Sequence, residues 1–188
     1  YDVYGHRSAV SLTGNERLAV LGQPSGQFAV LDAVSGQAVW TAKGEGLPIF
    51  IAPCLGSGFL AAASAQRMGG AAASVYDLST GERRFEIRQP GMILARPPAA
   101  CGDRLYLALQ DTRLRAYNAA QGREAWQYAL GAPPVAVDAT PQMVVCVLVN
   151  LDVVALDPNA AAPDKRLLWR AASDVGGQFA GLIVDGDE

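Results

Sequence analysis

A stretch of twelve residues that returns along the chain constrains the fold more than any other feature. It runs from Ala29 to Trp40, and three later segments restate it with drift. In each copy an Asp or Asn stands before an aromatic residue, by eight positions in the first three copies and by twelve in the fourth. The copies are Asp32, Gly36 and Trp40; Asp77, Gly81 and Phe85; Asn118, Gly122 and Trp126; Asp157 and Trp169. The repeat distances are 45, 41 and 39 residues. A period near 40 with several short strands per unit is typical of β-propeller blades.

Turn residues divide each unit into four strand-length segments. Apolar runs of strand length alternate with Gly and Pro, which is the pattern of antiparallel strands joined by hairpins. No segment keeps a helical apolar period without a turn signal breaking it, so almost no helix is predicted. The sequence therefore predicts one all-β domain over 1–188, a β-propeller of four-stranded antiparallel blades. The blades are placed at about 5–44, 45–91, 92–132 and 133–175, with the start of a fifth at 176–188.

Several boundaries are specific enough to compare with a structure. The inner strand of the third unit is placed at Ile93–Ala99, and a turn is placed at Thr13–Glu16. A fifth inner strand is placed at Gly177–Val184. Two longer loops, Gln66–Ala71 and Pro158–Lys165, are expected to carry binding specificity because loops vary while the blades stay rigid.

Composition excludes some classes of protein. Just over half of the residues are hydrophobic, yet no run approaches the roughly 20 apolar residues of a membrane-spanning helix. The net charge of −3 is too small to predict nucleic acid as a partner. The first residues show no signal peptide, although the missing initiator Met leaves room for a removed N-terminal piece.

The potential ligands for metals are few. Cys54, Cys101 and Cys146 stand far apart, and their odd number and spacing favour buried small side chains over a disulfide framework or a zinc site. His6 is the only histidine, so a histidine cluster is excluded. The three Asp of the repeat stand before hairpin turns, where the side chain accepts backbone N–H bonds, so a turn role is predicted for them.

The repeat resembles a known family. The pattern through Leu31-Asp32, Ser35-Gly36 and Trp40 is similar to the tryptophan-docking repeat of PQQ-like, or quinoprotein-type, β-propellers. Copy two has Phe85 for Trp, copy three has Asn118 for Asp, and copy four lacks the Gly. The resemblance implies a ring of seven or eight blades, of which about four and a half are visible. The favoured interpretation is part of a larger propeller; two associating chains and early closure stay open.

The resemblance also implies two possible roles. Enzymatic members hold pyrroloquinoline quinone (PQQ) with calcium, and need an adjacent cysteine pair, a Glu/Asn/Asp calcium set and an aromatic platform. None of these can be matched to a motif here, so no catalytic, cofactor or metal residue is assigned and an enzyme is not favoured. A quinoprotein dehydrogenase with its catalytic residues outside this stretch is the alternative.

The favoured role is a non-catalytic scaffold for protein–protein contacts. Relatives of this kind include a periplasmic lipoprotein that helps assemble outer-membrane proteins and sensor domains of bacterial receptor kinases. The resemblance thus implies a bacterial, periplasmic or extracytoplasmic module with protein partners, no nucleic acid and no membrane insertion of its own. The free cysteines keep a cytoplasmic location as the alternative. Further partners are the remaining blades of a longer chain or a second copy.

One charged sector is a candidate interaction patch. Between Arg83 and Arg123 the chain has eight Arg against three acidic residues, a local charge of +5 that leaves −8 elsewhere. Arg is favoured at protein interfaces for its bidentate hydrogen bonding. The patch is assigned to Arg83, Arg84, Arg88, Arg113 and Arg115. The competing interpretation is that these are outward residues of ordinary strands.

Overall fold

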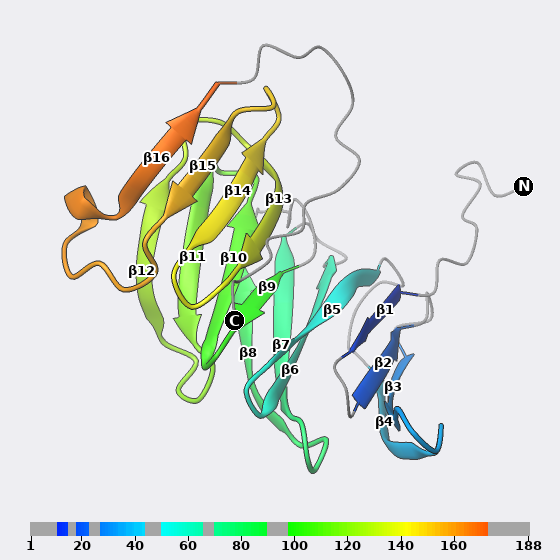
Figure 1. Cartoon of the computed structure of the whole chain (residues 1–188). Helices are drawn as coiled ribbons and strands as arrows, with labels where there is room; N and C mark the ends of the chain where they lie inside the picture. The colour runs from blue at the N-terminus through cyan, green and yellow to red at the C-terminus, as the bar shows by residue number, and fades with distance from the viewer. Residues whose placement is uncertain are drawn as a thin grey trace, which may run out of the picture.

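The structure is a computed structural model that describes residues 11–14, 18–22, 27–43, 50–65, 70–89 and 98–172. These residues form four separate sheets, each a four-stranded antiparallel meander (Figure 1). We call the sheets blades A, B, C and D in chain order. The all-β propeller fold predicted from the repeat is confirmed, and the four blades form an open arc rather than a closed ring.

Each blade takes its strands in sequence order from the inside of the arc to the outside. Blade A contains β1 (Ser11–Gly14), β2 (Leu18–Gly22), β3 (Gln27–Asp32) and β4 (Ala38–Lys43). Blade B contains β5 (Phe50–Gly56), β6 (Phe59–Ala65), β7 (Ala71–Asp77) and β8 (Arg83–Gln89). Blade C contains β9 (Ala99–Cys101), β10 (Arg104–Leu109), β11 (Arg113–Asn118) and β12 (Glu124–Ala129). Blade D contains β13 (Pro134–Ala139), β14 (Val144–Leu148), β15 (Val153–Leu156) and β16 (Leu167–Ala171).

The first strands of neighbouring blades lie against one another. Strand β1 contacts β5, β5 contacts β9, and β9 contacts β13. The fourth strands, β4, β8, β12 and β16, stand at the outer edges of their sheets. This is the arrangement of propeller blades around a common centre, with the outer strands at the circumference.

The core consists of three layers, one between each pair of adjacent blades. Between A and B, Val30 packs with Leu60 and Tyr76. Between B and C, a larger cluster includes Phe59 and Leu107. Tyr106, Ala108, Leu114, Val144, Cys146 and Leu148 pack between C and D. Because both faces of blades B and C are covered, their strands carry continuous apolar runs instead of a strict alternation.

A β-bulge recurs at the same place in all four blades. On the outer strand, one unpaired residue separates the repeat aromatic from the preceding paired residue, while their two partners on the third strand are consecutive. The unpaired residues are Val39, Arg84, Ala125 and Leu168. A bulge re-aims the side chains that follow it, and here it precedes the aromatic residue of every unit.

Three predicted boundaries are corrected. The inner strand of blade C is β9, at the end of the expected 93–99 range and beyond it, because Gly102 adopts a φ of 58° and closes a tight turn after Cys101. Thr13 and Gly14 belong to β1 and not to a turn, since they pair with β2. Ala71 opens β7 instead of ending a loop.

The described residues contain almost no helix, as the sequence predicts. The only helical segment in the described part of the chain is a 3-10 turn, η1 (Pro163–Lys165), within the expected loop 158–165. No helix of that part is long and apolar enough to cross a membrane. The expected strand at 177–184, residues 1–10 and loop residues 66–69 lie outside the described residues. The blade boundaries given above stay predictions.

Candidate functional site

The Asp or Asn of each repeat caps the hairpin that leads into the outer strand. Asp32 Oδ1 accepts hydrogen bonds from the backbone N–H of Val34 at 3.1 Å and of Ser35 at 2.7 Å. Asn118 Oδ1 accepts the equivalent pair from Ala120 and Gln121, both at 2.9 Å. These side chains are used in the turn, as Asp and Asn side chains are in many turns.

Asp77 makes the most extensive of these caps. Its Oδ1 accepts bonds from the N–H of Ser79 at 2.9 Å and of Thr80 at 3.0 Å, and from the Ser79 hydroxyl at 2.5 Å. Its Oδ2 accepts a bond from Arg84 Nη2 at 2.6 Å. The Ser79 hydroxyl, followed by the Arg84 guanidinium and the two N–H groups, holds the pKa of this carboxyl well below its usual range.

Asp157 makes a smaller cap in the fourth repeat. Its Oδ1 accepts a bond from the N–H of Asn159 at 2.7 Å. The turn that follows is longer than in the other repeats and contains η1.

In the first two units the aromatic residue docks on the turn of the next blade. Trp40 of blade A donates a hydrogen bond from Nε1 to the carbonyl of Leu78 in blade B, at 2.8 Å. Its ring lies against Gly81, so close that a Cβ there would stand 2.7 Å from Trp40 Cδ2. Gly81 also has a φ of +75°, which L side chains rarely adopt. Gly81 therefore allows both the backbone conformation of the turn and the close approach of the Trp40 ring from the neighbouring blade.

Phe85 repeats the contact one blade further on. A Cβ on Gly122 would meet Phe85 Cδ2 at 2.9 Å, and the φ of Gly122 is +69°. Phenylalanine has no N–H, so this interface uses the ring contact without the indole hydrogen bond. Gly36, in the first unit, has a φ of +71° but open space where a Cβ would stand.

The contact between blades C and D is built differently, because the fourth repeat lacks the glycine. The guanidinium of Arg166 stacks over the Trp126 ring, with Cζ 4.1 Å from the ring centroid. Arg166 is 5% exposed. It donates to the carbonyls of Asp157 at 2.8 Å, Pro158 at 3.2 Å and Ala160 at 2.7 Å. A buried arginine thus replaces glycine as the docking surface and holds the inserted loop in place.

This replacement leaves the indole nitrogen of Trp126 without an acceptor. Pro158 follows Asp157 as Leu78 follows Asp77, so its carbonyl is the counterpart of the one that Trp40 uses. Here that carbonyl accepts from Arg166 and from Arg104 Nη1. Trp126 Nε1 is buried and finds no hydrogen-bond partner among the described residues. Sequence reasoning missed Arg166; the lost glycine and the four extra residues beside it were the available signal.

Trp169 stands at the position of the docking aromatic in blade D. It pairs with Ala155, as Trp40 pairs with Val30 and Trp126 with Ala116. Its relative exposure is 45%, and no described blade lies beyond it. The face of blade D that carries Trp169 is therefore the equivalent of the faces that blades A, B and C bury against their successors.

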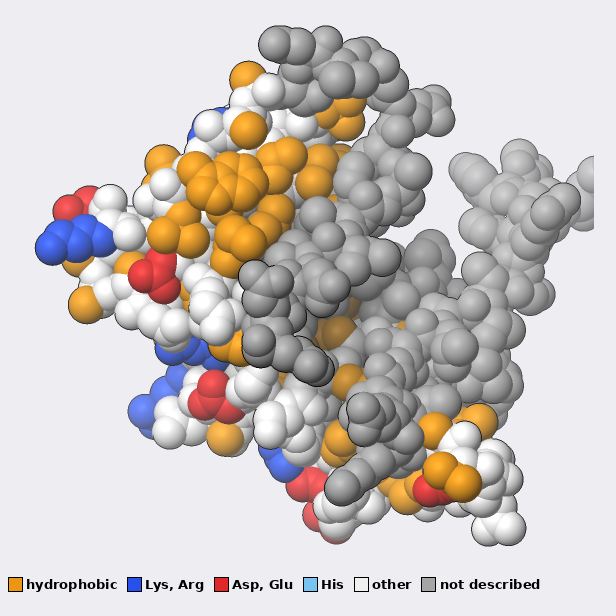
Figure 2. All heavy atoms as spheres, viewed as in Figure 1, with side chains coloured by type: hydrophobic (Ala, Val, Ile, Leu, Met, Phe, Trp, Pro, Cys, Tyr) orange, Lys and Arg blue, Asp and Glu red, His pale blue; other side chains and the backbone are white. Residues whose placement is uncertain are grey.

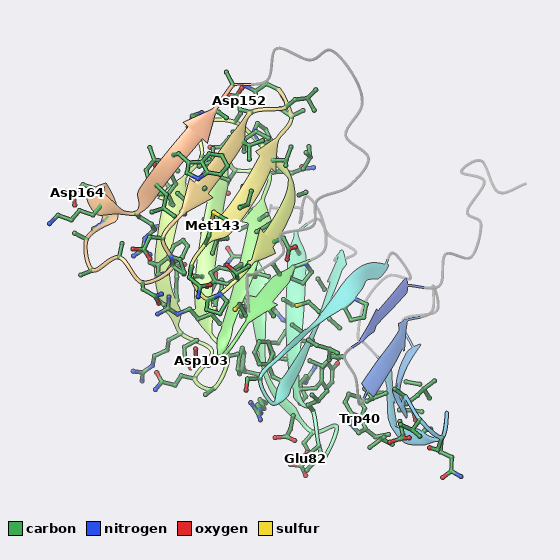
Figure 3. All side chains as sticks on the ribbon, viewed as in Figure 1. Trp40, Glu82, Asp103, Met143, Asp152 and Asp164 are labelled. Carbon is green, nitrogen blue, oxygen red and sulfur yellow. The ribbon has the colours of Figure 1, made fainter. Side chains whose placement is uncertain are left out.

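A small cavity lies where the inserted loop of blade D meets the inner hairpin of blade C. Its volume is about 270 Å³, and its polar lining includes Asp103, Arg104, Tyr106, Thr140 and Asn159. Asp103 on blade C and Met143 on blade D are labelled in Figure 3. The Met143 carbonyl accepts a hydrogen bond from the Thr140 hydroxyl at 3.4 Å. Asn159 Nδ2 donates to the carbonyl of Pro141 at 3.0 Å. Much of the polar lining is thus bonded within the walls.

The arginines of the predicted patch lie on β8 and β11, and most are paired with acidic neighbours. Arg83 and Arg88 both contact Glu86, and Arg84 contacts Asp77. Arg115 contacts Asp111 at 2.7 Å and also donates to Gln89 of blade B at 2.8 Å. Arg113 donates to Gln127 at 2.8 Å. These contacts reduce the local excess of positive charge, and the binding role of the sector stays a prediction.

The described residues do not fit a quinone and calcium site. The three cysteines lie in different blades, on β5, β9 and β14, and none is in a disulfide. Burial raises the pKa of the Cys54 and Cys146 thiols to about 12, so they remain protonated. No group of three or more His, Cys, Asp or Glu suited to a metal occurs among the described residues.

Solved structures with the same fold include designed and natural chains. The computationally designed Ika8 protein matches with a TM-score of 0.71 and 16% identity, over 89% of this chain and 50% of that chain. The designed Ika4 protein matches with a TM-score of 0.65 and 16% identity, over 83% of this chain and 95% of that chain. U3-55K matches with a TM-score of 0.66 and 13% identity, over 88% and 53%. This chain thus spans about half the length of Ika8 and of U3-55K, and the likeness shows the fold alone.

Sequence comparison gives the family. No curated protein matches the chain in a sequence search. A family model of PQQ repeats, described as outer membrane protein assembly factor BamB, matches residues 25–162. The match covers most of the chain and includes all of the repeat residues except Trp169. The chain therefore belongs to the PQQ-like β-propeller repeat family.

Proposed function

We propose that this chain is a non-catalytic scaffold that binds proteins during the assembly of outer-membrane proteins. The observation that carries the proposal is the match of residues 25–162 to the family model described as an outer membrane protein assembly factor. On this proposal the protein is bacterial and works on the periplasmic side of the outer membrane. Protein partners are proposed, and nucleic acid is not.

The architecture supports a scaffold role. An apolar cluster fills each interface between neighbouring blades, and Trp40, Phe85 and Trp126 pack against the following blade. Such a body presents its outer strands and turns on a rigid frame, which lowers the entropic cost of binding a partner. The arginines of β8, whose side chains are 31% to 68% exposed, and the inserted loop of blade D are then available for contact at the surface.

The proposal is tested in the source cell by removing the gene. We expect a lower amount of folded outer-membrane β-barrel proteins, measured by the mobility difference between unheated and heated samples on gels. Restoring the gene should restore the amount. The parent strain must first be shown to produce this protein. If the deleted strain then contains the same amount of every folded barrel protein as the parent, the assembly role is contradicted.

A separate measurement addresses the oxidoreductase alternative. We expect that PQQ with calcium leaves the tryptophan fluorescence of the purified protein unchanged and produces no dye-linked oxidation of alcohols. A quenched emission together with dye reduction would replace the scaffold proposal with the dehydrogenase alternative.

A further inference from the structure

The outer edge of blade D differs chemically from the equivalent edges of blades B and C. In the two positions before the aromatic, blade B has Arg83 and Arg84, and blade C has Glu124 and Ala125. Blade D has Leu167 and Leu168, which are 43% and 49% exposed. Charged residues on an edge strand discourage the addition of another strand, and β16 lacks them at these positions.

Completing the ring would not bury these two leucines. Blade C has a described neighbour on each side, and its Glu124 and Ala125 are still exposed. Trp126 of the same strand is partly buried by blade D. A further blade beyond D would by the same geometry cover Trp169 and leave Leu167 and Leu168 at the circumference.

The two leucines lie on the outer strand of blade D. Among the described residues, β16 is the last strand of its sheet and pairs on one side only, with β15. Leu167 is opposite Leu156, and Leu168 is the unpaired residue of the bulge. Figure 2 shows hydrophobic side chains gathered on the broad face of blade D that is turned to the viewer, beside this edge. The edge therefore offers backbone hydrogen-bonding groups and apolar side chains together.

We propose that the outer edge of β16 binds an extended segment of a partner protein, which pairs with the strand and covers Leu167 and Leu168. The occupant is a strand with apolar residues at alternate positions, because its backbone would continue the ladder while its side chains meet the leucines. The inference rests on the proposed function, since it names the kind of partner segment that the scaffold binds.

The test uses a fluorescein-labelled octapeptide of alternating Val and Thr as the probe. We expect saturable binding to the wild-type protein, measured by fluorescence polarisation, and slower amide hydrogen exchange over residues 167–171 in the complex. The variant L167R/L168R gives blade D the two residues that blade B already has, so the fold should accept it. It should weaken binding about tenfold or more, which is what losing the burial of one leucine supplies.

Two controls identify the mode of binding. A125R changes the exposed bulge residue of blade C, whose edge already carries the charged Glu124, and should leave the affinity unchanged. A peptide that is N-methylated at alternate residues keeps its side chains but cannot form the ladder, so it should bind the wild-type protein about tenfold or more weakly.

Four results would overturn the inference: no binding of the parent peptide, equal binding by L167R/L168R, equal binding of the N-methylated peptide, or a wild-type dimer that the double variant abolishes. The last would make a second copy the occupant. Failure of the scaffold proposal would be seen separately, as an unchanged amount of folded barrel proteins in the deleted strain, independent of the result of the peptide-binding experiment.

Discussion

Glycine and the repeat aromatic act as one unit at two blade-to-blade contacts, between A and B and between B and C. Gly81 and Gly36 have nearly the same backbone conformation, with φ of +75° and +71°, but Gly81 has Trp40 against it and Gly36 has open space. Substituting Gly36 therefore measures the free-energy cost of the turn conformation alone, whereas substituting Gly81 measures that cost together with the cost of disturbing the Trp40 contact.

We expect G81A to destabilise the protein more than G36A. G36A should cost about 1 kcal/mol because alanine must adopt a left-handed conformation. G81A should cost roughly 3 kcal/mol, since the methyl group also displaces the Trp40 ring. Urea unfolding of the two variants measures the difference. Equal losses would mean that the Trp40 contact contributes nothing to stability.

The indole hydrogen bond can be removed while most of the ring contact is kept. Phe85 already occupies this position in blade B, so W40F places a residue there that the repeat accepts. We expect a loss of about 1 kcal/mol, the usual contribution of one hydrogen bond. Thermal unfolding measures it. A variant as stable as the wild type would show that the bond from Nε1 to Leu78 is not formed.

Asp77 makes the free energy of unfolding depend on pH. Its folded pKa is lowered by the Ser79 hydroxyl, the Arg84 guanidinium and two N–H groups. The ionised carboxylate therefore stabilises the fold above the ordinary Asp pKa of 3.8, and this contribution is lost as the pH falls below that value toward the folded pKa.

The variant D77N is the test of this dependence. Asn118 caps the same turn in blade C, so the fold should accept the amide. We expect D77N to have a lower melting temperature than the wild type at pH 7, with the difference shrinking between pH 4 and pH 2. A difference that stays constant with pH would contradict the role of the charge.

The strands of each blade could be predicted from local signals, whereas the contact between blades C and D could not. Gly and Pro at the turns and apolar runs between them predict four strands per unit, because hairpin connection and strand length are local properties. The replacement of glycine by Arg166 depends on three carbonyls of an inserted loop converging on one guanidinium. That convergence is set by the path of the loop, which no short pattern in the sequence encodes.

Arg166 should be essential to the order of β15, the inserted loop and β16. We expect R166M to destabilise the protein by about 2 kcal/mol or more, because three carbonyls lose their donor and the stacking on Trp126 is lost. R170M is the matched control: Arg170 lies on β16, the strand that begins just after Arg166, and is exposed. It pairs with Asp152 at 3.2 Å and donates to the Leu130 carbonyl at 3.1 Å, so its loss should cost only about 1 kcal/mol. Equal effects in urea unfolding would contradict the special role of Arg166.

The four blades behave as an arc in which each unit is completed by its successor. Three such contacts are described, and the Trp169 face repeats the start of a fourth. The periodic sequence was sufficient to predict this stacking, since each copy brings the same turn and aromatic. It could not predict what covers the Trp169 face, because that depends on groups beyond the visible repeats. The remaining blades of a longer chain and a second copy both stay predictions.

The docking of each aromatic on the next blade is the central structural claim, and the three tryptophans report on it directly. We would record the ¹H–¹⁵N indole signals of the protein, assigned with single Trp→Phe variants, and follow their exchange in D₂O. Trp40, bonded to Leu78, should exchange slowly, Trp126 should be protected by burial, and Trp169 should exchange fast. If the indole of Trp40 exchanges as fast as that of Trp169, the blades do not dock in the way described.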